Sequence, residues 1–133
     1  MDIKEVNVIG AGLAGSEVCY QLLKRGYKVN LFEMKPVKFS PAHKNKNFAE
    51  LVCSNSLKSN DVTSACGLLK EELRHLDSLV INIADSVKVP AGSALAVDRE
   101  LFSQKITDKL KSFKNLNIIE GEVSSFDTTK PTI

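Results

Sequence analysis

The chain has 133 residues, of which 43% are hydrophobic and 26% are charged, a composition typical of one ordinary globular domain and not of a disordered or fibrous chain. Its 18 Lys and Arg residues against 16 Asp and Glu residues give a net charge of +2, which neither requires nor excludes a nucleic-acid partner. The N-terminal residues lack the pattern of a signal peptide, and no segment is apolar enough to span a bilayer, so we expect no membrane association.

The N-terminal segment predicts a strand, a helix and a second strand. Residues 4–9 form a short run that ends in apolar side chains, as expected for a buried parallel strand. Residues 13–24 have apolar side chains at helical spacing, and Gly26 follows at the position of a helix C-terminal cap. Residues 28–33 form the second strand and complete a βαβ unit of about 30 residues.

Between the first strand and the helix, three glycines have the G-x-G-x-x-G spacing of a dinucleotide site. Gly10 permits a tight turn, Gly12 lets the backbone approach a pyrophosphate, and Gly15 lets the helix pack close to the strand. Glu33 ends the second strand, where an acid accepts hydrogen bonds from an adenosine ribose. Three glycines in an ordinary loop are the alternative, but the surrounding elements favour the site. Its assigned residues are Gly10, Ala11, Gly12, Leu13, Ala14, Gly15 and Glu33.

After Glu33 the chain changes character, and residues 34–47 predict a loop. This segment contains two prolines, four lysines and His43, and it has no acidic residue. Its positive charge could meet a phosphate or an RNA backbone, or it could simply be a solvated loop. Residues 48–60 begin with apolar side chains and continue with hydroxyl and amide side chains, so we expect a loop with little regular structure.

The clearest helical pattern follows, and it predicts one long helix capped by Thr63 or Ser64. We expect its apolar stripe to pack in the core; the stripe consists of Leu68, Leu69, Leu73, Leu76, Leu79, Val80 and Ile83. Residues 87–90 and 94–97 then predict two short extended segments that are joined by a turn.

The C-terminal part predicts another helix and another strand. Asp98 is a good N-cap for a helix with one apolar face, made of Leu101, Phe102, Ile106, Leu110 and Phe113. Residues 117–123 predict a strand, and residues 128–133 form no obvious closing element. The order predicts an α/β fold, a Rossmann-like doubly wound parallel sheet, with an insertion over roughly residues 34–97 and an incomplete C-terminal end.

The three cysteines have neither metal-site nor disulfide spacing, which indicates a reducing cytoplasm. Cys53 precedes Ser54, Asn55 and Ser56, and this polar setting could support a thiolate nucleophile. No base is visibly paired with it, so a small buried hydrophobe is the other interpretation. We expect Cys19 and Cys66 to be packing residues.

Much of the chain resembles the start of the folate- and FAD-dependent tRNA uracil-C5 methyltransferases. The similar segments are residues 8–17, 32–36, 41–43, 48–60, 67–72, 89–92 and 94–100. The segment around Cys53 is far more specific than the glycine motif. Ser93 stands where that family usually has glycine, and Cys19 and Cys66 are not part of its pattern.

This resemblance implies an enzyme that methylates the T-loop uridine of tRNA to ribothymidine. Methylenetetrahydrofolate supplies the carbon, while reduced FAD, recharged by NAD(P)H, carries it and supplies reducing equivalents. Cys53 is similar to the family's cysteine near this chemistry, either as the nucleophile that attacks uracil C6 or as a guard of the flavin adduct.

The resemblance also implies that residues 1–133 are the N-terminal part of an FAD-binding domain whose remainder is missing. We therefore expect this polypeptide alone to be at most a partial FAD-binding module without activity. The nearest alternative is the glucose-inhibited division protein A group of tRNA-uridine modifying flavoproteins, although residues 13–17 and 33–36 favour the methyltransferases. A non-catalytic nucleotide-binding module is a further alternative, and the sequence predicts no oligomeric state.

Overall fold

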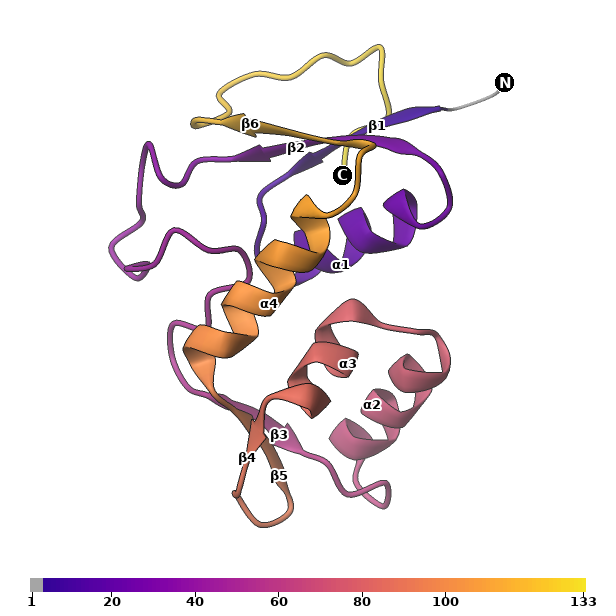
Figure 1. Cartoon of the computed structure of the whole chain (residues 1–133), viewed down its shortest axis with the longest axis vertical. Helices are drawn as coiled ribbons and strands as arrows, with labels where there is room; N and C mark the ends of the chain where they lie inside the picture. The colour runs from indigo at the N-terminus through magenta and orange to yellow at the C-terminus, as the bar shows by residue number, and fades with distance from the viewer. Residues whose placement is uncertain (1–3) are drawn as a thin grey trace.

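A parallel sheet and a smaller antiparallel sheet lie at opposite ends of the molecule in the computed structural model, which describes residues 4–133 (Figure 1). The parallel sheet consists of β1 (Glu5–Ile9), β2 (Lys28–Glu33) and β6 (Leu116–Glu120), in the order β1-β2-β6. Helices α1 (Leu13–Leu23) and α4 (Arg99–Lys111) cover one of its faces (Figure 1). The predicted Rossmann-like α/β fold is confirmed.

The two faces of the parallel sheet differ in chemistry. Buried valines and leucines of β1 and β2, such as Val8 and Leu31, pack in the core with α1 and α4. Three asparagines in register occupy the alternate positions: the Asn30 amide donates to Asn7 Oδ1 at 3.0 Å, and the Asn117 amide donates to Asn30 Oδ1 at 3.1 Å. The period of two along each strand explains this separation, since successive side chains point to opposite faces.

The last residues pair with β1, so the prediction that they form no closing element is wrong. The Asn7 and Ile9 N–H groups donate to the carbonyls of Pro131 and Ile133, each at 2.9 Å. Thr132 is thereby a parallel bridge partner of Asn7. The resulting order, β6-β2-β1 and then residues 131–133, matches the 3-2-1-4 order of the doubly wound fold.

The antiparallel sheet is made of β3 (Ser56–Ser59), β4 (Lys88–Val89) and β5 (Ala94–Val97), in the order β3-β5-β4. Both predicted extended segments are confirmed as β4 and β5. The prediction of a loop over residues 48–60 is wrong for β3. Its serine-rich sequence has weak strand propensity, but pairing with β5 supplies backbone hydrogen bonds that local sequence does not reveal.

The predicted long helix is instead two helices, α2 (Ala65–His75) and α3 (Leu79–Ser86). Asp77 at the break has a left-handed φ of 55°, and the Ser78 hydroxyl accepts a hydrogen bond from the Ile81 N–H. The expected core packing holds for Leu79 but is wrong for three leucines of the first helix and the break, which are 51–67% exposed: Leu68, Leu69 and Leu76. The leucine spacing continues across the break, which conceals it.

The Asp98 cap of α4 is confirmed, because its carboxylate accepts from the N–H groups of Glu100 and Leu101. Most of the predicted apolar face is buried, although Leu101 is exposed. The strand predicted over 117–123 ends earlier, at Glu120, where Gly121 adopts a φ of 134°. Within residues 4–133, no helix has the length and apolar character needed to cross a membrane.

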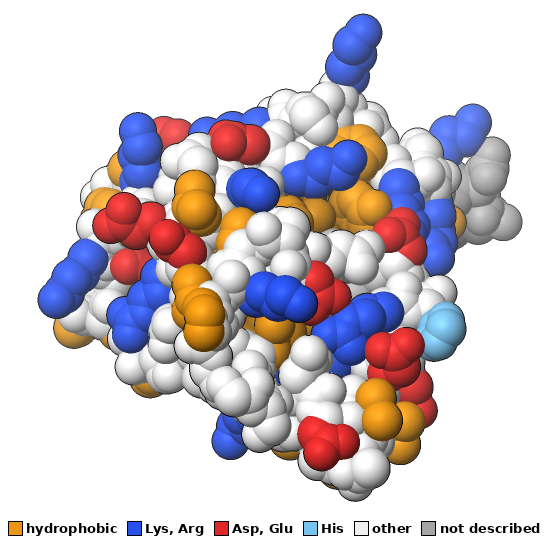
Figure 2. Space-filling model, turned by 60° about the horizontal axis from the view of Figure 1, so that its bottom comes forward, with side chains coloured by type: hydrophobic (Ala, Val, Ile, Leu, Met, Phe, Trp, Pro, Cys, Tyr) orange, Lys and Arg blue, Asp and Glu red, His pale blue; other side chains and the backbone are white. Residues whose placement is uncertain are grey.

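The surface has charges of both signs. Figure 2 shows Lys and Arg side chains interspersed with Asp and Glu side chains on one face, with small apolar areas between them. This agrees with the net charge of +2. On this face, charge alone therefore does not single out a nucleic-acid surface.

Candidate functional site

The glycine turn has the geometry that a dinucleotide requires. Gly10 has a φ of +90°, and its N–H donates to the Phe32 carbonyl at 2.7 Å. A Cβ on Gly15 would lie 1.9 Å from the Gly10 oxygen, so only glycine allows α1 to pack this close to β1. A Cβ on Gly12, by contrast, would have no heavy atom of the described residues within 4 Å. Gly12 therefore faces open space in front of the α1 N-terminus, where a pyrophosphate fits.

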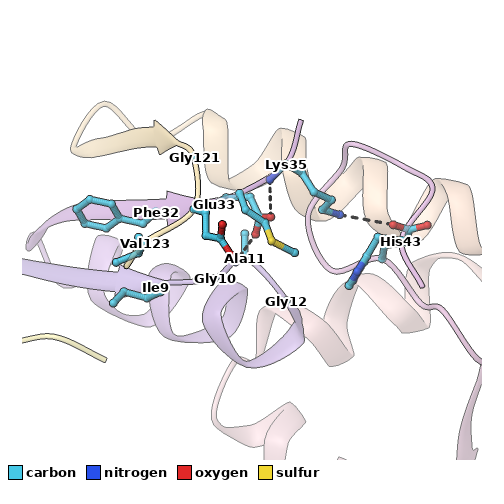
Figure 3. Close-up of a pocket in the computed structure, with 13 residues that line it drawn as sticks. Ile9, Gly10, Ala11, Gly12, Phe32, Glu33, Lys35, His43, Gly121 and Val123 are labelled. Atoms are coloured by element: carbon cyan, nitrogen blue, oxygen red, sulfur yellow. Dashed lines mark hydrogen bonds and ion pairs between the residues drawn. The ribbon is translucent and has the colours of Figure 1, made fainter. Parts of the chain in front are cut away.

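A pocket of about 330 Å³ opens beside this turn at the carboxyl ends of the parallel strands (Figure 3). Its walls come from the ends of β1 and β2, the loop after β2 and the turn after β6. The lining residues are Ile9, Gly10, Ala11, Gly12, Phe32, Glu33, Met34, Lys35, His43, Glu50, Gly121, Glu122 and Val123. Ligands of doubly wound folds bind at this edge of the sheet.

Glu33 is buried at the pocket wall, with 6% of its surface exposed. Its Oε2 accepts a hydrogen bond of 2.7 Å from the Ala11 N–H, and its Oε1 accepts one of 2.9 Å from the Lys35 N–H (Figure 3). A carboxylate has about four acceptor directions, so about two of them remain for ligand hydroxyls. The predicted ribose acid thus also holds the glycine turn itself.

Five of the seven assigned dinucleotide residues lie together or in direct contact: Gly10, Ala11, Gly12 and Glu33 line the pocket, and Gly15 packs against Gly10. The other two, Leu13 and Ala14, begin α1 and are exposed, outside the residues that line the pocket. Their backbone N–H groups belong to the first turn of the helix, which has no intrahelical partners for them.

The basic loop is more than a solvated segment, because Lys35 points into the protein. Its Nζ donates to the carbonyls of Asn45 at 3.0 Å and Asn47 at 2.6 Å, and it lies 3.5 Å from Glu50 Oε2. Burial opposes ionisation of Glu50, but hydrogen bonds from the N–H groups of Lys44 and Asn45, followed by the charge of Lys35, outweigh it and lower the carboxyl pKa.

The other lysines of the loop are exposed, as the solvated interpretation expects. Lys38 pairs with Glu122, and Lys44 and Lys46 face solvent. His43 lines the pocket, and its Nδ1 lies 2.6 Å from the Ser40 hydroxyl.

Cys53 is exposed, so the interpretation of it as a small buried hydrophobe is wrong. It lies outside the residues that line the pocket, but its loop is attached to the glycine turn: the Ala49 N–H donates to the Ala11 carbonyl at 2.8 Å. The Arg99 guanidinium lies 3.4 Å from the Cys53 carbonyl oxygen. The candidate nucleophile thus lies four residues beyond a direct contact with the dinucleotide site.

The other two cysteines differ from each other. Cys19 is fully buried in α1, and burial raises its thiol pKa to about 12, which confirms its packing role. Cys66 is exposed in the first turn of α2, so the packing prediction for it is wrong. Among residues 4–133, the His, Cys, Asp and Glu side chains form no cluster of three that could hold a metal ion.

One part of the pocket, the turn that follows β6, was not predicted from the sequence. Gly121, Glu122 and Val123 line it, because β6 lies beside β2 and ends at the same edge of the sheet. The signal was available: the predicted strand at 117–123 is the third strand of the fold, and the carboxyl ends of parallel strands converge on one ligand site.

Comparison with known proteins agrees with this architecture. The family model described as "Glucose inhibited division protein A" matches residues 5–133. A curated relative from Thermosipho africanus, named methylenetetrahydrofolate--tRNA-(uracil-5-)-methyltransferase TrmFO, is 62% identical over 122 residues, covering 92% of this chain and 28% of the relative. A protein of the same name from Staphylococcus carnosus is 62% identical over 120 residues, covering 90% of this chain and 28% of the relative.

The chain therefore spans about 28% of the length of these curated relatives. Among solved structures, a crystal structure of an MHPCO mutant superimposes with a TM-score of 0.55 at 13% identity, covering 95% of this chain and 34% of the other. At that identity the likeness shows the fold alone. The 62% identity confirms the resemblance to the tRNA uracil-C5 methyltransferases that the sequence indicated. This chain belongs to the family that the matching model describes as glucose inhibited division protein A.

Proposed function

We propose that this chain is the dinucleotide-binding part of an FAD- and folate-dependent tRNA uracil-C5 methyltransferase. The observation that carries the proposal is the 62% identity with a curated methyltransferase across 92% of the chain. The pocket beside the glycine turn supports it, since its open Gly12 and buried Glu33 fit a dinucleotide. In this proposal the parallel sheet, α1 and α4 form the FAD-binding unit, and residues 34–97 are an insertion.

Different residues of the pocket would bind different parts of the cofactor. The N–H groups at the start of α1, beginning with Leu13 and Ala14, would hold the pyrophosphate, and Gly12 leaves room for it. The free lone pairs of Glu33 accept the ribose hydroxyls. When bound, FAD reduced by NAD(P)H would supply the reducing equivalents and carry the carbon of methylenetetrahydrofolate.

Cys53 is the proposed catalytic residue of this chain. Uracil C5 is a poor nucleophile, and attack of a thiolate at C6 places electron density on C5. An exposed thiol on a loop attached to the glycine turn fits this role, and it equally fits a guard of the flavin adduct. We propose tRNA as the substrate and the cytoplasm as the compartment, in keeping with three free thiols.

Cofactor binding is tested by reconstituting the purified chain with FAD and measuring retained flavin absorbance, which separates FAD from NAD. Gly12→Val should abolish retention, because its side chain occupies the space that the pyrophosphate needs. Ala91→Val is the matched control, since it adds similar bulk at an exposed turn of the antiparallel sheet. Flavin retained by Gly12→Val would contradict the proposed geometry.

The role of Cys53 is tested in the whole protein with Cys53→Ala. Lost tRNA methylation with retained flavin supports a chemical role, and unchanged methylation refutes it. Cys66→Ala is the matched control, because this thiol is also exposed but lies on α2.

A second candidate is the alternative that the sequence left open, a tRNA-uridine modifying flavoprotein of the glucose-inhibited division protein A group, whose name the matching family model carries. It would use the same dinucleotide pocket, so FAD binding does not separate the two. The reaction does: the methyltransferase transfers a carbon from methylenetetrahydrofolate to uridine C5 in the T-loop. A protein that binds FAD but modifies a different tRNA uridine would favour the second candidate.

A further inference from the structure

A closed circuit of hydrogen bonds joins the glycine turn, the acid at the end of β2 and the loop that leads to Cys53. Both backbone polar groups of Ala11 are engaged, since its N–H donates to Glu33 and its carbonyl accepts from the Ala49 N–H. The second oxygen of Glu33 accepts from the Lys35 N–H. The Lys35 side chain then donates to the carbonyl of Asn47, two residues before Ala49, which closes the circuit.

Lys35 is the centre of this circuit. The residue is 5% exposed, and a buried ammonium persists only where partners replace its water. Its partners are the carbonyls of Asn45 and Asn47 and the carboxylate of Glu50, so its charge is compensated within the protein. All of these partners belong to residues 45–50. The lysine therefore fixes one stretch of chain and is not available to an external phosphate.

The stretch that Lys35 fixes leads directly into the Cys53 loop. Ala49 has a φ of 51°, a conformation that non-glycine residues adopt only where the surroundings impose it. The hydrogen bond to Ala11 on one side and the buried Phe48 on the other impose it here. Residues 45–50 are thus connected to Ala11 by a hydrogen bond and to Cys53 by the next three residues of the chain.

We propose that Lys35 is a positioning residue that couples dinucleotide occupancy to the order of the Cys53 loop. The inference rests on the proposed function, because a ligand at Glu33 and the glycine turn is what stiffens the circuit. The coupling is reciprocal, so a loosened loop also weakens dinucleotide binding. Lys35 itself touches neither the pyrophosphate nor the uracil in this proposal.

The cysteines of the chain supply the test. Alkylation by iodoacetamide is followed by peptide mass spectrometry with and without saturating FAD. ADP serves as a second probe, because it fills the same pocket without a flavin ring that could cover the thiol. Cys66 is the internal reference, exposed on α2, and Cys19 is the folding control, since it is buried in the native protein.

In the wild-type chain, FAD and ADP should each slow labelling of Cys53 about 5-fold relative to Cys66, a coupling of ordinary size. Lys35→Met should remove this ligand dependence at saturating ligand, and Lys35→Arg, which keeps the cation, should restore most of it. Protection that persists in Lys35→Met would overturn the proposal, because the ligand would then act without the lysine. Ligand-independent labelling of Cys53 in the wild type would overturn it as well.

Two further outcomes keep the test decisive. If Lys35→Met exposes Cys19 and is therefore unfolded, Glu50→Gln replaces it, because it removes the charge partner of Lys35 and keeps a carbonyl acceptor; unchanged protection in that variant overturns the proposal. If neither the chain nor the whole protein binds FAD or ADP, the proposed function fails and this inference fails with it. If FAD or ADP binds but does not change the labelling of Cys53, this inference is refuted and the proposed function stands.

Discussion

Gly15 and Gly12 have opposite surroundings, so replacing each of them with alanine gives a matched pair of variants. In Gly15→Ala the new Cβ would lie 1.9 Å from the Gly10 oxygen, a backbone atom that has no freedom to rotate away. Restoring a contact of about 3.0 Å therefore requires α1 to move by about 1 Å away from β1.

The expected free energy follows from two opposing terms. Overpacking of this kind costs about 3 kcal/mol, and the better helix propensity of alanine offsets about 1 kcal/mol of it. We expect Gly15→Ala to lower the free energy of unfolding by about 2 kcal/mol, which is roughly a 6–10 °C fall in Tm for a domain of this size.

Gly12→Ala should have little effect on stability but a large effect on FAD binding. Within the described part of the chain no heavy atom lies within 4 Å of the new Cβ, and the φ of −75° suits alanine. The loss of a favourable N-cap glycine costs at most about 1 kcal/mol, or roughly 4 °C in Tm. The methyl group fills the space proposed for the pyrophosphate, so FAD affinity should fall at least about 10-fold, or about 1.4 kcal/mol.

Thermal melts with and without FAD measure both quantities, because bound ligand raises Tm according to its affinity. A Tm of Gly12→Ala as low as that of Gly15→Ala would contradict the difference in their surroundings. Wild-type FAD affinity in Gly12→Ala would contradict the space proposed for the pyrophosphate.

Three further predictions concern other parts of the chain. Glu17 of α1 caps α3 by accepting hydrogen bonds from the Ser78 hydroxyl and two backbone N–H groups, so Glu17→Ala should cost about 1–2 kcal/mol in urea unfolding; an unchanged midpoint would show that this cap contributes nothing. Cys19, with its pKa of about 12, should resist alkylation in the native protein and react only after unfolding, whereas Cys53 reacts natively; native labelling of both at equal rates would contradict the burial. Folding lowers the pKa of Glu50, so the stabilisation that its ionised carboxylate contributes is fully present above the ordinary carboxyl pKa of 4.5 and is lost as pH falls through the lowered value. Glu50→Gln should therefore reduce the loss of stability at acid pH that urea unfolding measures. An unaltered loss would assign it to other carboxylates.

Local sequence patterns predicted much of the fold. β2 and α1 were predictable because apolar periodicity, a glycine cap and the strand-turn-helix spacing act within a few residues of each other. The same holds for the Asp98 cap, whose carboxylate bonds the next turn of its own helix. The break at Asp77 escaped prediction because the leucine spacing continues through it, and the partner that caps the following helix, Glu17, is far away in the sequence.

The glycine turn and the family were predictable from the sequence, since the glycine spacing and the Cys53 segment are properties of contiguous residues. How these two features meet depends on contacts between residues that are distant in the sequence. Glu33 accepts a hydrogen bond from the N–H of Ala11, which lies 22 residues earlier, and the Ala11 carbonyl accepts one from the Ala49 N–H. Sequence patterns do not predict these long-range backbone partners. They also do not predict a buried Lys35, because basic residues are ordinarily solvated. In the folded chain Lys35 is buried, and the carbonyls of Asn45 and Asn47 and the Glu50 carboxylate compensate its charge.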